Sequence, residues 1–106
     1  MPRQRDRVGW ADPGLLILAS LADGAKHGYA IIKDVEEQTS IRLGPGTLYA
    51  AISRLEGSGL VAAVDGDERR RPYRLTVEGQ AVLDDRLRAM ARFARAGLTR
   101  LGVAGA

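Results

Sequence analysis

The sequence contains no cysteine, a single histidine and few aromatic residues. The lack of cysteine excludes disulfide bridges, thiolate metal sites and cysteine nucleophiles, and it is typical of a protein in a reducing cytoplasm. With His27 as the single histidine, a nucleophile-and-base pair cannot be assembled, and no Walker-type phosphate loop is present. The sequence therefore argues against an enzyme and against a bound cofactor, and only a hydrolase built on carboxylates alone stays open.

Long apolar runs are also missing. The longest, LLILASLA at residues 15–22, is far shorter than the roughly 20 residues that a membrane-spanning helix needs. The first ten residues, MPRQRDRVGW, lack the apolar stretch of a signal peptide. We therefore expect no membrane association and a cytoplasmic location.

What the chain does contain is enough for one modest core and an excess of positive charge. Its 106 residues are 45% hydrophobic and 27% charged, which fits a single compact unit. Sixteen Lys and Arg against thirteen Asp and Glu give a net charge of +3, which favours an anionic partner. Only Lys26 and Lys33 are lysines. The arginines suit bidentate contacts with phosphates and base edges.

Local signals predict two short helices near the start of the chain. Asp12 followed by Pro13 is typical of an N-cap and first helical residue, and Gly24 closes this helix. A second helix is expected over about residues 28–39, because its apolar residues recur at helical spacing and its charged residues face outward. An arm of polar and basic residues precedes both helices.

A third helix is predicted after the turn that ends at Gly44. Pro45 is a favourable first residue, and apolar residues recur at i, i+3, i+4 and i+7, so one narrow stripe is buried. That stripe consists of Leu48, Ala51, Ile52 and Leu55. The opposite face carries small, polar or aromatic residues, which suits contact with a partner: Gly46, Thr47, Tyr49, Ala50, Ser53 and Arg54.

A β-hairpin and one long helix are expected in the second half. Residues 60–64 and 72–75 are predicted to pair across a turn at Asp65 and Gly66. Thr76 caps the final helix, although Gly79 stands where a capping box needs Glu or Gln. A seam follows this helix in steps of four and three, as in a helix that pairs with a partner. We predict that it is a dimer interface formed by Leu83, Leu87, Met90, Ala94, Leu98 and Leu101.

These elements predict a mainly α fold with a small β-hairpin, namely a winged helix-turn-helix at residues 1–75 followed by a dimerisation helix at residues 76–106. A helix that lies in the major groove needs a fixed start, which glycine and proline at 44–46 supply. The basic hairpin can grip phosphates beside that groove. The predicted DNA-binding residues are Gly46, Thr47, Tyr49, Ser53, Arg54, Arg69, Arg70, Arg71, Tyr73 and Arg74.

The chain resembles the PadR family of bacterial transcriptional regulators over residues 14 to about 83. The resemblance lies in HGYAIIKDVEEQT, LGPGTLYAAISRLEGSGLV and DERRRPYRLTVEGQ, in the order and spacing of that family. It implies a homodimeric winged helix-turn-helix repressor of the compact type, which binds double-stranded operator DNA. Ala50 stands where the family often has proline, and Pro72 replaces the first of two tyrosines before RLT.

Other functions stay open at this point. A winged helix and a long helix can serve as a protein-interaction module that reads no DNA sequence, and a metal-responsive repressor needs ligands beyond His27. RNA binding is disfavoured because the chain has few aromatic residues for stacking. The resemblance also suggests a hydrophobic or aromatic effector, and we place its pocket near Trp10 and Met90 at the dimer seam.

Overall fold

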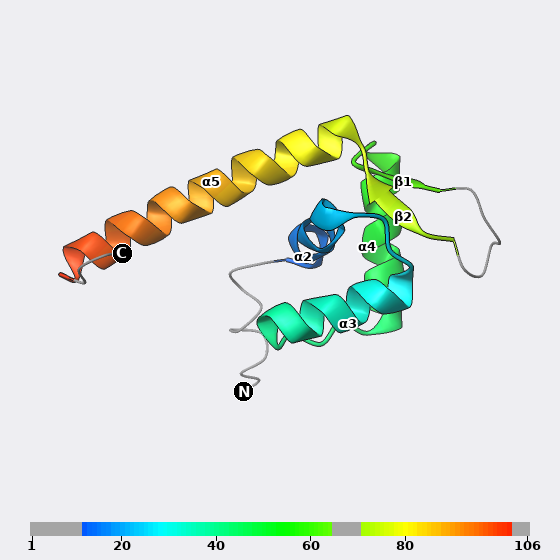
Figure 1. The fold of residues 1–106 in the computed structure, drawn as a ribbon, viewed down its shortest axis with the longest axis horizontal. Helices are drawn as coiled ribbons and strands as arrows, with labels where there is room; N and C mark the ends of the chain where they lie inside the picture. Colours follow the sequence, from blue (N-terminus) through cyan, green and yellow to red (C-terminus); the bar gives the residue numbers. More distant parts are fainter. Residues whose placement is uncertain (1–11, 65–70, 103–106) are drawn as a thin grey trace.

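The computed structural model describes residues 12–64 and 71–102. Its elements follow one another as α2 (Pro13–Ser20), a 3-10 turn η1 (Leu21–Asp23), α3 (Gly28–Thr39), α4 (Pro45–Gly57), β1 (Val61–Ala63), β2 (Tyr73–Leu75) and α5 (Val77–Arg100). The predicted fold class, mainly α with a small hairpin, is confirmed (Figure 1). Three predicted site residues, Trp10, Arg69 and Arg70, lie outside the described residues.

Each helix start follows from a local signal in the sequence. The Asp12 carboxylate accepts a hydrogen bond of 2.7 Å from the Leu15 amide and so satisfies one of the free N–H groups at the start of α2. Proline occupies the first turn of both α2 and α4. The Thr76 hydroxyl caps α5, because it accepts from the Gly79 amide at 2.9 Å and donates to the Gly59 carbonyl at 2.7 Å.

The core lies where α2, α3 and α4 meet. α2 is apolar on nearly all sides and fills the centre, with Ile17 fully buried, while α3 and α4 each bury one stripe. Leu83 from the start of α5 closes the same core. The buried apolar residues are Leu15, Leu16, Ile17, Leu18, Leu21, Ile31, Val35, Ile41, Leu43, Leu48, Ala51, Ile52, Val61 and Leu83.

The two strands form an antiparallel hairpin in which Val61 pairs with Leu75 and Ala63 with Tyr73. The Pro72 carbonyl extends this pairing by accepting from the Val64 amide at 2.8 Å. Proline therefore fits here as an acceptor, although it supplies no amide donor of its own. The tip of the hairpin, residues 65–70, lies outside the described residues.

Gly79 has a structural reason that the capping signal did not reveal. A Cβ on this residue would stand 2.0 Å from the Leu60 carbonyl oxygen, so only glycine lets the first turn of α5 pack against the start of the hairpin. The Thr76 amide also donates to that same carbonyl at 3.1 Å. Close packing between α5 and the wing therefore takes the place of a complete capping box.

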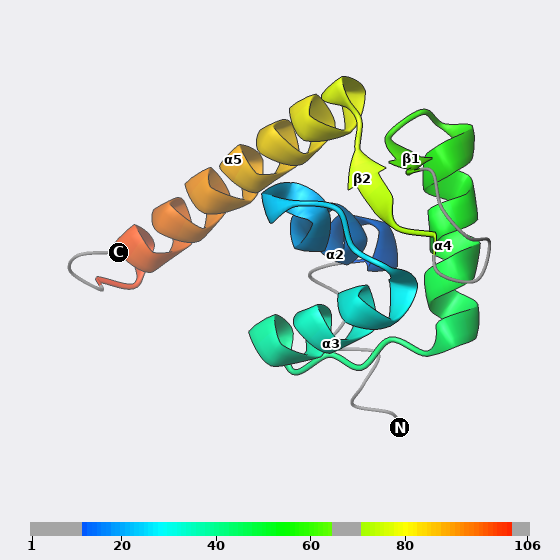
Figure 2. The ribbon, with the colours of Figure 1, turned by 45° about the vertical axis from the view of Figure 1, so that its right-hand side comes forward.

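α5 leaves the body of the molecule after its first turns. It has 24 residues, hence a length of about 36 Å at roughly 1.5 Å per residue. Figures 1 and 2 both show its C-terminal half extending away from α4 and from the core. Within the two described ranges, no helix has the length and apolar character required to cross a lipid bilayer.

Candidate nucleic-acid interface

α4 separates its residues onto two faces. The inner face buries Leu48, Ala51 and Ile52, and Leu55 packs partly against them, as the spacing predicted. The outer face is exposed along the whole helix and consists of small or polar residues, among them the predicted contact residues Gly46, Thr47, Ser53 and Arg54. No acidic side chain lies on α4 before Glu56. This outer face can therefore approach a polyanion closely.

Tyr49 lies between the outer face of α4 and the start of α3. Its side chain is 48% exposed, while its hydroxyl lies over Gly28, where a Cβ would stand only 2.3 Å from the hydroxyl oxygen. Gly28 thus provides the space into which the phenol fits. The structure brings together α3 and the predicted recognition helix at this contact, and it leaves about half of the Tyr49 side chain available to a partner.

The wing places its predicted residues differently from one another. Arg74 is exposed on the outer side of β2 and donates to the Leu75 carbonyl at 3.1 Å, whereas Arg71 is half-buried. Tyr73 points inward and packs partly against the core. Burial raises the pKa of the Tyr73 phenol above its ordinary value, and the Glu56 carboxylate adds to the rise. Tyr73 is thus a structural anchor of the wing as well as a candidate contact.

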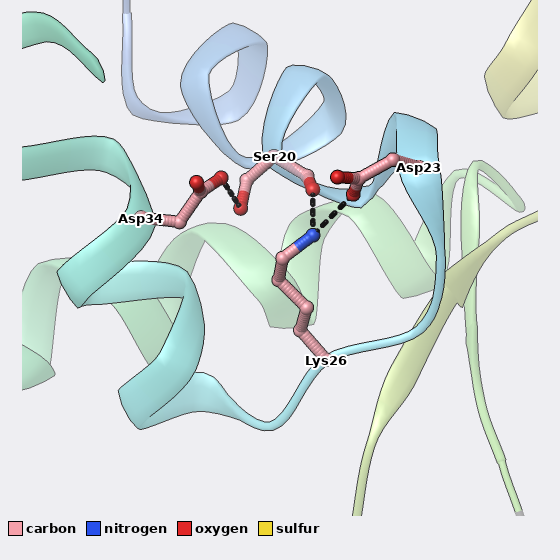
Figure 3. A network of polar contacts seen from close by, with 4 residues as sticks. All are labelled: Ser20, Asp23, Lys26 and Asp34. Atoms are coloured by element: carbon pink, nitrogen blue, oxygen red, sulfur yellow. Dashed lines mark hydrogen bonds and ion pairs between the residues drawn. The ribbon is translucent and has the colours of Figure 1, made fainter. Parts of the chain in front are cut away.

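A polar network holds the wing and the start of α3 in register (Figure 3). The Lys26 ammonium donates to the Ser20 carbonyl and to the Asp23 carboxylate, and its backbone exchanges two hydrogen bonds with Tyr73, of 3.0 and 2.9 Å. The Ser20 hydroxyl donates to Asp34 of α3 at 2.7 Å. Lys26 therefore joins the end of η1, the loop before α3 and β2, although its sequence gave no sign of this role.

The predicted dimer seam on α5 divides into two parts. Leu83 is 5% exposed within its own core and Met90 packs partly against that core, so Leu83 has almost no surface left for a partner. This corrects the assignment of Leu83 to the interface, because the start of α5 lies against α2 and completes the monomer's core. The remaining seam residues Leu87, Ala94, Leu98 and Leu101 are exposed.

Phe93 was missed by the sequence reasoning. It is 82% exposed on the same half of α5, although it lies beside the four-three seam. The available signal was that it is the only phenylalanine of the chain and stands among arginines and alanines. Large apolar side chains left exposed on a projecting helix indicate a surface that a partner covers.

Two shallow grooves occur in the described part of the chain, and neither includes Met90. One, of about 390 Å³, lies between α2 and α3, and the other, of about 430 Å³, runs along the end of α5. The first is lined by Leu16, Ala19, Ser20, Ala22, Asp23, Asp34, Val35, Gln38 and Thr39. Within residues 12–64 and 71–102, no three His, Asp or Glu side chains gather as a metal site would require.

Sequence comparison relates the chain to known regulators. The profile of the Transcriptional regulator PadR-like family matches residues 17–85. A transcriptional regulator of Mycobacterium tuberculosis is 39% identical over 85 residues, which cover 76% of this chain and 78% of that protein. An uncharacterised 37.1 kDa protein of a Streptomyces fradiae transposon is 44% identical over 81 residues, but the chain spans only 24% of its length.

Structure comparison gives the same relationship. A PadR family transcription regulator of Clostridium difficile superposes with a TM-score of 0.71 at 29% identity, covering 84% of this chain and 96% of that one. A PadR family regulator of Eggerthella lenta superposes with a TM-score of 0.70 at 30% identity, covering 95% and 88%. These similarities agree with the winged-helix arrangement of α2 to β2.

Proposed function

Because this chain belongs to the PadR-like family of transcriptional regulators, we propose that it is a cytoplasmic homodimeric repressor whose α4 reads a pseudo-palindromic operator while the wing grips the phosphate backbone. The observation that carries the proposal is the outer face of α4, which is exposed, small or polar, and free of acidic residues before Glu56. Such a face can enter the major groove and place side chains against base edges.

We assign the homodimer to the C-terminal half of α5 and retain residues 76–106 as the dimerisation unit. Support comes from the exposed apolar side chains of Leu87, Phe93, Leu98 and Leu101 on a helix that projects from the body. A second copy offers the same surface, so a two-fold interface covers both sets at once. The two recognition helices then meet successive major grooves, with half-sites about 10 base pairs apart or a multiple of that spacing.

The helix and the wing have different tasks in this proposal. Thr47 and Ser53 lie on the ordered α4 and contact base edges, so their replacement by alanine costs about 1–3 kcal/mol per lost base contact on the operator and little on random DNA. Arg71 and Arg70 contact phosphates. Their replacement by alanine weakens binding to both duplexes and lowers the salt slope by about two per dimer.

A salt titration of binding to the operator and to a scrambled duplex tests this division. The operator is obtained first, by footprinting the promoter of the operon beside the gene. Equal losses and equal slopes for the helix and wing variants would contradict the division of tasks. Wild-type binding to a partner that ignores salt, with no preference for the operator, would instead favour a protein-interaction module over a DNA reader.

Release by a hydrophobic or aromatic effector completes the proposal. We place the effector between the protomers, near Trp10 and the partly buried Met90, where binding changes the distance between the recognition helices. Trp10 is the single tryptophan, so its fluorescence reports on this location alone. If compounds that release the DNA leave Trp10 fluorescence unchanged, the effector does not bind there. Chelators and added divalent metals test the metal-responsive alternative in the same assay.

A further inference from the structure

α3 carries an exposed aromatic and cationic pair that the DNA-binding residues above do not include. Tyr29 is 70% exposed at the start of α3, and the Lys33 ammonium lies 5.9 Å from the centre of its ring. The two residues are one helical turn apart, so they share one face. A cation above a tyrosine ring is oriented by the π electrons, which limits the positions that the flexible lysine samples.

This pair lies beside the face that α4 presents. Gly28, the residue before Tyr29, is buried under the Tyr49 hydroxyl, and Leu48 also lies against it. The start of α3 therefore abuts the first half of α4. In a helix-turn-helix the helix before the recognition helix crosses the nucleic-acid backbone, so a group at this junction meets the strand at the edge of the groove.

The charges on α3 are distributed in agreement with this orientation. Its N-terminal half, from Gly28 to Lys33, contains one cation and no acidic residue. The first acidic residue, Asp34, accepts a hydrogen bond from Ser20 of α2. Glu36 is paired with Arg42 at 2.9 Å, and Glu37 lies in the last turns. The end of α3 beside α4 thus attracts an anion, and the acidic end lies away from it.

We propose that Tyr29 and Lys33 form a phosphate contact on the DNA strand that borders the α4 groove. Lys33 supplies the charge, and the Tyr29 hydroxyl donates a hydrogen bond to a phosphate oxygen. The inference rests on the proposed DNA-binding function, and it adds an anchor on α3 to the contacts from α4 and the wing. Because a phosphate carries no base identity, the pair contributes affinity and register without sequence preference.

The test uses the full chain and three variants with matched chemistry. Lys33→Gln removes the charge, Lys33→Arg keeps it, and Tyr29→Phe removes only the hydroxyl. Arg92→Gln is the control, because it removes one exposed positive charge from α5, remote from α4. Circular dichroism and light scattering check that each variant keeps its fold and assembly. Binding is followed by fluorescence anisotropy on operator and scrambled duplexes over a range of salt.

We expect Lys33→Gln to weaken binding to both duplexes and to lower the slope of log K against log salt by about two per dimer. Lys33→Arg and Arg92→Gln keep the wild-type slope. Tyr29→Phe weakens binding by roughly threefold to tenfold without a change in slope, since a neutral hydrogen bond is lost.

Two results overturn the inference, and they are distinguishable. If the wild type shows no salt-dependent binding to either duplex, the DNA-binding proposal fails and this inference fails with it. If the wild type binds and the Thr47 and Ser53 variants lose the operator, but Lys33→Gln keeps the slope of Arg92→Gln, only the α3 contact is wrong. A Lys33→Gln variant that loses the operator alone also contradicts a phosphate contact.

Discussion

α4 and α5 are both amphipathic, but they leave opposite kinds of surface uncovered. α4 buries its apolar stripe completely within the core and exposes small and polar residues along its length. α5 buries only Gly79 and Leu83 and leaves Leu87, Phe93 and Leu98 exposed on a projecting helix. The first helix is therefore finished as part of a monomer, whereas the second still has apolar surface that water contacts.

This difference separates two interfaces by their chemistry. A polar and basic face binds a polyanion through phosphate contacts that release counterions, so its affinity falls steeply with salt. An apolar face associates through the hydrophobic effect, which salt does not screen. The experiments below change one helix or one contact at a time, and they test whether the two interfaces respond independently.

Leu87→Asp should have the largest effect. It places a charge in the proposed α5 interface and should cost on the order of 3 kcal/mol of dimerisation free energy, because a buried unpaired charge is poorly compensated. Light scattering measures the mass. Thr99→Asp is the matched control, since Thr99 is exposed on α5 away from the apolar line. A Leu87→Asp dimer that persists at micromolar concentration would show that this part of α5 is not the interface.

Gly79→Ala should affect the joint between the wing and α5. The added Cβ would stand 2.0 Å from the Leu60 carbonyl oxygen, so the first turn of α5 must move. We expect a loss of about 1–3 kcal/mol in the free energy of unfolding, as for overpacking in a core. Urea unfolding measures this loss. Gly97→Ala, where the new Cβ meets nothing within 4 Å, should leave stability unchanged or raise it slightly.

Gly28→Ala should disturb α4 more than it disturbs the fold. Its Cβ would displace the half-exposed Tyr49 phenol, which has solvent to move into, so the stability cost should be about 1 kcal/mol. Affinity for the operator should fall about tenfold. In a Tyr49→Leu background the same substitution should cost much less, and a double-mutant cycle measures this coupling. Additive effects would mean that Gly28 does not position Tyr49.

Asp12 should give the smallest effect, and it should depend on pH. The Leu15 amide donates to its carboxylate and holds the pKa of Asp12 below the ordinary 3.8, with Arg86 adding to the shift. The resulting stability is therefore present above about pH 4 and is lost as pH falls through the lowered pKa. Asp12→Ala should cost about 1 kcal/mol at pH 7, and Asp12→Asn only a few tenths, because asparagine still caps.

Unfolding of wild type and Asp12→Asn at pH 7 and pH 3 isolates the charge. The difference between the two proteins should shrink at the lower pH, since the wild-type carboxyl is then partly protonated. A difference that stays constant between the two values would mean that neither the helix start nor the Arg86 contact, of 3.2 Å, depends on the charge.

The sequence by itself determined the helix starts, the order of elements and the two faces of α4. Asp12, Pro45 and Thr76 act on groups within three or four residues of themselves, so their effects are local and can be predicted without a fold. The burial of Leu48 and Ile52 follows from helical spacing for the same reason. The family resemblance came from these same motifs.

Only the tertiary structure decided which part of the α5 seam serves the monomer. Leu83 and Leu87 have the same place in the apolar pattern, yet Leu83 lies against the core and Leu87 lies beyond much of it. The spaces at Gly28 and Gly79 and the role of Lys26 are equally hidden, because each depends on a segment distant in the chain that comes within contact distance. Periodicity describes one element alone, whereas burial depends on where its neighbours end.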